Sequence, residues 1–188
     1  MYGNSFKYKL IMNKSQMLRT LARRQGLCDE WYNKWDEFCD DEELLQKAEM
    51  GMHFICKYDY PGLESARKMF DKEQLKVHNI YLDQKVFLGN FNGEIKNHDI
   101  LLMGNTSGMV VYKGYAVANV YVMHNCELTI ECNNLCKVFI TASGNAKLNI
   151  ISNDAASVYV YRYGNVTCNT KGDVKIKERE NVKIEKIL

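Results

Sequence analysis

The C-terminal half of the chain repeats a short pattern of alternating apolar and polar residues. From residue 109 onward it divides into blocks of about nine residues, with slips of one or two, that close on Gly, Asn or Ala. Alternation with a period of two predicts a strand with one buried face. Gly and Asn suit tight corners because both tolerate a positive φ. The blocks therefore predict a series of short strands joined by corners.

Two architectures fit such a series: a β-solenoid of stacked coils, and an antiparallel meander folded as a sandwich or barrel. The inward residues are small or branched and alike from block to block, as a narrow solenoid interior requires. Hairpins favour Asn-Gly turns, whereas residues 144–145 and 164–165 read Gly-Asn. We therefore favour the solenoid and keep the meander as the alternative. The expected interior includes Val120, Ile130, Val138, Leu148 and Val158.

The N-terminal part of the chain has helical signals instead. Ser15 is expected to cap a helix that stops at Gly26, and Asp40 to cap a helix with an acidic first turn. An open coil exposes backbone and core, so we expect these helices to cover the first coil. The fold class predicted is α+β, with a helical cap and a solenoid of strand-turn repeats. The expected parts are a helical head over 1–75, a β connector over 76–108 and a β-solenoid over 109–188.

Basic and acidic residues are unevenly distributed along the chain, and the net charge is small. Residues 1–27 carry six bases and no acid, and residues 28–75 carry thirteen acids and six bases. The whole chain has a net charge of only +2, too small to predict nucleic acid or an anionic membrane as the main partner. No run approaches the roughly 18 apolar residues of a membrane span, and no secretory signal is visible. Seven cysteines, an odd number, are expected to be reduced thiols in a cytoplasmic protein.

Several motifs of the first half resemble a known family. Gly26-Leu27-Cys28 is followed by Trp31 and Trp35, then by Gly51, Phe54 and Cys56, Tyr60-Pro61, and the connector Val86-Phe87-Leu88-Gly89-Asn90. This layout, ahead of a repetitive β tail, resembles a family of short uncharacterised proteins of gut anaerobes, often found in prophages or other mobile elements. The resemblance covers about residues 18–178 and implies a phage or mobile-element accessory protein. It implies no activity and no catalytic residue.

Residues that could carry chemistry are few. His124, Cys126, Cys132 and Cys136 have the right types for zinc, but they lack a Cys-x-x-Cys pair and are expected on or near the inward face. His124 with Cys126 or Cys132 could form a nucleophile pair, although buried thiols are inert. His53 is expected to be structural, and His78 and His98 to lie on the surface. Glu127 and Glu131 are not nearest neighbours on their face, and residues 104–108 lack the lysine of a phosphate-binding loop. We therefore assign no catalytic residue, no metal ligand and no cofactor.

Aromatic residues on the outward face are more informative. Tyr112, Tyr121, Phe139, Tyr159 and Tyr161 alternate with the expected interior positions, and Tyr163 follows; the last four of the five define the contact face that we expect. Rings gathered on a weakly charged sheet face predict a surface that is covered by the head, by a second copy of the chain or by a partner. We expect self-association, which makes these four residues the candidate interface.

The sequence therefore predicts a non-catalytic binding or assembly protein, homo-oligomeric and encoded by a phage or mobile element. Two alternatives stay open. One is an inhibitory module that sequesters a host protein or a small signal. The other is an enzyme, either a β-helical carbohydrate-active one or a thiol hydrolase.

Overall fold

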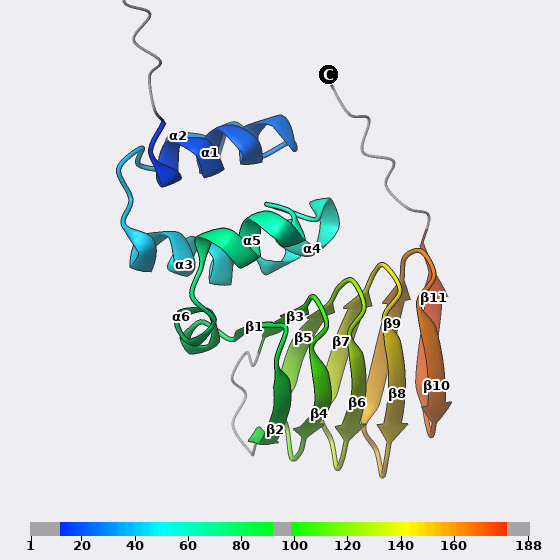
Figure 1. Cartoon of the computed structure of the whole chain (residues 1–188). Helices are drawn as coiled ribbons and strands as arrows, with labels where there is room; N and C mark the ends of the chain where they lie inside the picture. The colour runs from blue at the N-terminus through cyan, green and yellow to red at the C-terminus, as the bar shows by residue number, and fades with distance from the viewer. Residues whose placement is uncertain (1–11, 92–98, 180–188) are drawn as a thin grey trace, which may run out of the picture.

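The structure is a computed structural model that describes residues 12–91 and 99–179, in which helices precede a parallel β-solenoid (Figure 1). The helices are α1 (Lys14–Arg24), α2 (Asp29–Asn33), α3 (Asp41–Met50), α4 (Met52–Tyr58), α5 (Leu63–Met69) and α6 (Lys72–Val77). The first strands are β1 (Ile80–Leu82), β2 (Lys85–Phe91), β3 (Ile100–Met103), β4 (Ser107–Tyr112), β5 (Val117–Val122) and β6 (Glu127–Cys132). They continue as β7 (Lys137–Ala142), β8 (Lys147–Ser152), β9 (Ser157–Arg162), β10 (Thr167–Lys171) and β11 (Val174–Glu178).

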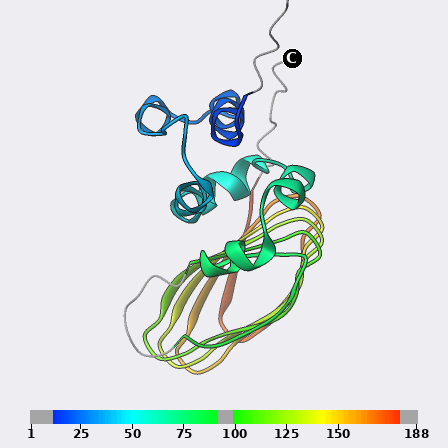
Figure 2. The same cartoon turned by 60° about the vertical axis from the view of Figure 1, so that its left-hand side comes forward.

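The strands alternate between two parallel sheets. The first sheet has the order β1-β3-β5-β7-β9-β11, and the second has the order β10-β8-β6-β4-β2. Every pairing is parallel, which confirms the solenoid and excludes the antiparallel meander. Viewed nearly along the axis, the coils overlie one another as a flattened loop with the helices on one side (Figure 2).

The coil length follows from the register of these pairs. Val117 pairs with Lys137, and Lys137 pairs with Ser157, so one coil takes 20 residues and each strand with its corner takes ten. The expected repeat of about nine residues was one short. The Gly, Asn or Ala that ends each block stands at a different place in successive corners. Blocks cut after these residues therefore vary in length and average less than ten residues.

The interior of the solenoid is a strip of small and branched side chains. All five residues expected there, from Val120 to Val158, are buried. The first residue after each corner, such as Cys126, Cys136 or Ala146, is fully buried as well. Burial ends with β10 and β11, the last strands of their sheets, where Ile176 is 42% exposed.

The segment 76–108, expected to be a connector, supplies strands to the solenoid. β1 pairs with β3, and β2 pairs with β4, both in the same parallel manner as the later strands. The solenoid of the structure therefore begins at Ile80. β1 has only three residues, and the corner between β1 and β2 is Asp83-Gln84 rather than Gly-Asn, so a search for repeats misses this first coil.

α1, α3 and α6 begin where side chains satisfy their free amides. α1 is capped by Asn13 and Gln16 rather than by Ser15. Ser15 is buried instead, where its hydroxyl donates to the Asp36 carbonyl and accepts from the Trp35 indole. Asp40 caps α3, as expected, and forms a reciprocal capping box with Glu43. No helix of the described residues combines the length and apolar character needed to cross a membrane.

The helices pack on the outer face of the first sheet, where a second hydrophobic core forms. Outward residues of β1, β3 and β5 join buried residues of the helices in this cluster. The helices therefore lie beside the first strands of this sheet (Figure 1), and α4 reaches as far as one end of β7, where the Cys56 thiol lies 3.9 Å from the Thr141 carbonyl. The sheet residues of this core are Ile80, Leu82, Leu101, Met103 and Met123, with Tyr121 packed against them.

Candidate functional site

The four aromatic residues of the expected interface share one face of the first sheet, but they do not share one environment. Tyr121 packs against the helical core, and its ring lies edge-on to His53 at 6.3 Å between centroids. Burial raises the pKa of Tyr121 to about 12. The helices thus pack against Tyr121, which is half-buried, and the other three rings, which are also half-buried, lie outside this core. Tyr112, expected on an outward face as well, is buried in the interior instead.

Phe139, Tyr159 and Tyr161 form a compact group on these strands. Phe139 pairs with Tyr159 across β7 and β9, and their rings stack with centroids 5.3 Å apart and planes 18° apart. Tyr161 lies one outward position further along β9. The parallel register places these residues side by side because partners 20 residues apart lie on adjacent strands.

Cations border the rings. Lys137 Nζ lies 5.4 Å from the Phe139 centroid, and Lys175 Nζ lies 5.3 Å from the Tyr159 centroid. The Arg179 guanidinium lies 5.2 Å from the Tyr161 centroid, a distance typical of cation–π contacts. Within the bounds of β7, β9 and β11, no outward-facing side chain is acidic. We call this surface the basic–aromatic strip; its members are Lys137, Phe139, Tyr159, Tyr161, Lys175, Lys177 and Arg179.

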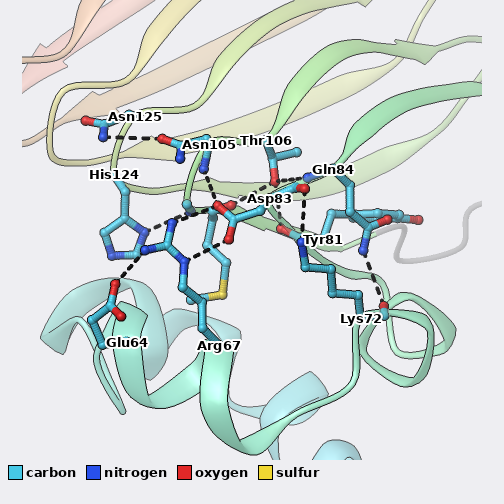
Figure 3. A network of polar contacts seen from close by, with 12 residues as sticks. Glu64, Arg67, Lys72, Tyr81, Asp83, Gln84, Asn105, Thr106, His124 and Asn125 are labelled. Carbon is cyan, nitrogen blue, oxygen red and sulfur yellow. Dashed lines mark hydrogen bonds and ion pairs between the residues drawn. The ribbon is translucent and has the colours of Figure 1, made fainter.

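A second polar site joins the helices to the solenoid (Figure 3). Arg67 of α5 makes two hydrogen bonds to the Asp83 carboxylate, at 2.8 and 2.9 Å, and a third to Glu64. Asp83 lies in the turn between β1 and β2, and its carboxylate also accepts from the Asn105 amide at 2.8 Å. The Arg67 contact, together with the Asn105 amide, holds the pKa of Asp83 at about 2, although burial opposes this. The pair therefore links a helix, the first coil and the next corner.

Asp83→Asn is expected to lower the free energy of unfolding at pH 7 by about 1–2 kcal/mol, because it removes the charge that satisfies Arg67. The pKa of Asp83 is lower in the folded chain than the usual value of about 3.9, so its contribution is complete above pH 4 and is lost as pH falls towards 2. Urea unfolding of both proteins at pH 7 and pH 3 tests this. The difference in free energy of unfolding between the unmodified protein and Asp83→Asn should be smaller at pH 3 than at pH 7. An equal difference at both pH values would refute the charge effect.

His124 forms another tether between the two parts. Its Nδ1 accepts from the Gly104 amide at 3.1 Å, so Nε2 carries the proton and donates to Asp59 at 2.8 Å. His124 therefore lies at a corner and points towards the helices, whereas it was expected on or near the inward face. Both ring nitrogens are occupied, which leaves neither available as a general base.

The thiol nearest to this tether does not have the properties of a nucleophile. Cys56 lines a pocket with His124, Asp59 and Ser143. Burial raises the pKa of Cys56 to about 12, so the thiol stays protonated at neutral pH. Together with the engaged histidine, this arrangement gives no support to thiol hydrolysis.

The cysteines that were considered as zinc ligands are interior residues. Cys126, Cys132 and Cys136 are fully buried, and burial raises the pKa of Cys126 to about 12. The Cys136 thiol and burial raise the pKa of Cys132. Over residues 12–91 and 99–179, no three His, Cys, Asp or Glu side chains are arranged to hold a metal ion.

The remaining candidates have structural surroundings. His78 is buried and contacts Glu49 and Glu42 of α3 at 3.1 and 3.3 Å, although a surface position was expected. Burial lowers the pKa of His78, but these carboxylates outweigh it and the net shift is upward. His53 is exposed. His98 lies outside the described residues.

The other polar candidates belong to the strands and corners of the solenoid. Glu127 pairs with Lys147 on the next strand at 2.5 Å, and Glu131 accepts from Asn133. Gly104 and Asn105 form a corner, and Ser107 and Gly108 begin β4. The outer side chains of β6 therefore do not form a pair of convergent acids.

An apolar cavity lies within the helical part. Three rings from two helices, Trp31 of α2 with Phe54 and Tyr58 of α4, line it together with Leu18 and Leu27. The lining is almost entirely apolar, with little to orient a reacting group. The cavity therefore indicates loose packing between α1, α2 and α4 rather than a site for chemistry.

The contacts at the joint were not visible in the sequence. Arg67 and Asp83 are 16 residues apart, and Asp59 and His124 are 65 apart, so neither pair has a characteristic spacing. Asparagines on successive coils are also linked: Asn125 donates to Asn105 at 3.4 Å, and Asn145 donates to Asn125 at 3.2 Å. The recurrence of Asn every 20 residues could have predicted these contacts, but it is recognised only when the coil length of 20 residues is known.

Comparison of the chain with protein-family models, with curated proteins and with solved structures finds no match.

Proposed function

We propose that the protein is a non-catalytic binding and assembly protein that makes its contact through the basic–aromatic strip. One observation carries the proposal: the helices pack against the first strands of the sheet, with Tyr121 half-buried beside them, while three half-buried rings on the next strands lie outside that core and are bordered by cations. Aromatic residues with arginine are typical of protein contact surfaces. The engaged His124 and the buried thiols support a role in binding over one in catalysis.

Source and assembly state belong to the same proposal. The resemblance in the head supports a phage or mobile-element accessory protein. A strip of rings on an otherwise regular solenoid supports a homo-oligomer. An inhibitory module that captures a foreign protein would use the same surface, and self-association is the preferred function because it needs no additional component.

We also propose that the helical part acts as the cap of the solenoid. β1 and β2 are the first strands of their sheets, and a first strand presents an unpaired edge. α6 leads directly into β1, and Leu75 of α6 is buried in the same core as Ile80. The helices would thereby shield the start of the solenoid while leaving its last strands open for contact.

Phe139→Ser/Tyr159→Ser is expected to abolish association, because it removes the stacked rings while leaving the interior strip intact. Light scattering across a concentration series measures the effect: the average mass of the unmodified protein should rise with concentration, and that of the variant should stay at the monomer mass. Phe87→Ser is the matched control, because Phe87 is 77% exposed on the other sheet. If the double variant associates as well as the control, the strip is not the contact surface.

A further inference from the structure

The charge of the basic–aromatic strip restricts what can lie against it. Its rim carries Lys137, Lys175, Lys177 and Arg179, and the outward residues of the three strands include no acid. A two-fold symmetric dimer through this face would place each strip against its own copy. Opposed like charges destabilise an interface, so the strip is unsuited to a symmetric contact with itself.

The orientation of the rings points to an anionic partner. Phe139 and Tyr159 stack on each other, and Lys137 lies over both rings, at 5.4 and 5.7 Å from their centroids. The ring faces are thus turned towards each other and towards cations, which leaves ring edges for a partner. Aromatic edges carry partial positive charge, like the cations around them. The surface complementary to the strip therefore combines acidic side chains with an exposed apolar side chain.

The chain itself carries such a surface in the turn between α2 and α3. Phe38 is 77% exposed, and no lysine or arginine occurs from residue 35 to residue 46. Glu37 pairs with Arg19, Asp41 with Lys14, and Glu42 contacts His78. The other three acids of this turn, Asp36, Asp40 and Glu43, form no ion pair with the described residues. We call residues 36–43 the acidic turn; its acids are Asp36, Glu37, Asp40, Asp41, Glu42 and Glu43.

The acidic turn and the strip lie at opposite ends of the molecule along the solenoid axis. Figure 1 shows the α2–α3 turn beyond the β1 end and β11 at the far end. A chain therefore cannot place its own turn on its own strip, whereas a second copy displaced along the axis can. Contacts between two different surfaces of identical chains are head-to-tail, and they propagate unless they close into a ring.

We infer that the acidic turn of a second copy, with Phe38 as its apolar anchor, occupies the basic–aromatic strip and joins the chains head to tail. This inference rests on the proposed function and specifies its partner. Because the contact pairs opposite charges, raising the salt concentration from 0.05 M to 0.5 M weakens it.

Two charge-reversed variants test the inference. The strip variant is Lys175→Glu/Lys177→Glu, and the turn variant is Asp36→Lys/Glu37→Lys. Each alone is expected to need a protein concentration about tenfold higher, or more, for the same degree of association in sedimentation velocity. An equimolar mixture is expected to recover association, because the reversed turn of one chain then matches the reversed strip of the other.

Controls separate loss of contact from loss of fold. Lys85→Glu/Lys171→Glu makes the same change in net charge on exposed positions of the other sheet, and it should associate like the unmodified chain. Phe38→Ser changes an exposed side chain without altering charge, and it should weaken association as the turn variant does. Circular dichroism melts verify that each variant is folded.

The outcomes distinguish this inference from the proposed function. Association that is lost in Phe139→Ser/Tyr159→Ser but kept in both the turn variant and Phe38→Ser would leave the proposed function standing and overturn the acidic turn as partner. Lack of recovery in the mixture of folded variants would overturn it as well. An unmodified protein that is monomeric at every concentration would overturn both.

Discussion

Gly108→Ala is expected to unfold the protein or to lower its free energy of unfolding by more than about 4 kcal/mol. Gly108 has a φ of +137°, and a Cβ built on it would lie 1.9 Å from the carbonyl oxygen of Val86. That oxygen belongs to the backbone of β2, which pairs with β4, so it cannot move aside without breaking the pairing. Chemical unfolding monitored by circular dichroism measures the loss.

The control for this substitution is Gly89→Ala in the neighbouring strand. A Cβ at Gly89 would meet only the Phe87 ring, at an ordinary contact distance of 3.5 Å. Its effect is expected to stay within about 1 kcal/mol. Similar losses at Gly108 and Gly89 would contradict the close approach of β2 and β4.

The position of Gly108 in the register explains its importance. It occupies the place in β4 that Leu128 takes in β6 and Leu148 takes in β8. In the first coil the Val86 carbonyl occupies the space next to Gly108 that the Leu side chains of β6 and β8 need for their Cβ atoms. Glycine at this position is therefore a requirement of the first coil and not part of the repeat.

Ile140→Ala is expected to lower the free energy of unfolding by about 2–5 kcal/mol, as large-to-small substitutions in packed interiors do. Ile140 is fully buried in β7, with Val120 and Val160 as its partners on the adjacent strands. Each coil of a solenoid is stabilised by its neighbours, so a cavity in the middle coil weakens contacts on both sides. Urea unfolding measures the change.

Two milder substitutions calibrate this result. Ile140→Val keeps the branched shape and is expected to cost about 0.5–1.5 kcal/mol. Asn149→Ala, at an exposed outward position of β8, is expected to change the stability by less than about 0.5 kcal/mol. If Ile140→Ala cost no more than Asn149→Ala, the interior strip would not be the main source of stability.

Much of the solenoid was predictable because its pattern is local. Side chains alternate between the two faces of a strand, so Val138 and Ile140 could be placed inside, and Phe139 outside, from their spacing alone. The coil length was less accessible. Gly, Asn and Ala stand at different positions in successive corners, so blocks that end at them vary in length and do not show that two strands make one coil.

The division of the aromatic face was not predictable. Tyr121 and Tyr161 occupy the same outward position two strands apart, with Thr141 between them. Their sequence contexts are alike, yet Tyr121 packs against the helical core and Tyr161 does not. Which strand lies beneath a helix depends on where the whole helical part docks, and no spacing of residues expresses that.

The sequence by itself determined the later strands of the solenoid, their inward and outward faces and the start of α3 at Asp40, since each depends on residues a few positions apart. Only the tertiary structure decided that the coil holds two strands, that residues 80–103 belong to it, and that Arg67 and His124 tie the helices to its side. Those features rest on contacts between distant residues, whose energies depend on the packing of the assembled chain and leave no periodic trace in the order of amino acids.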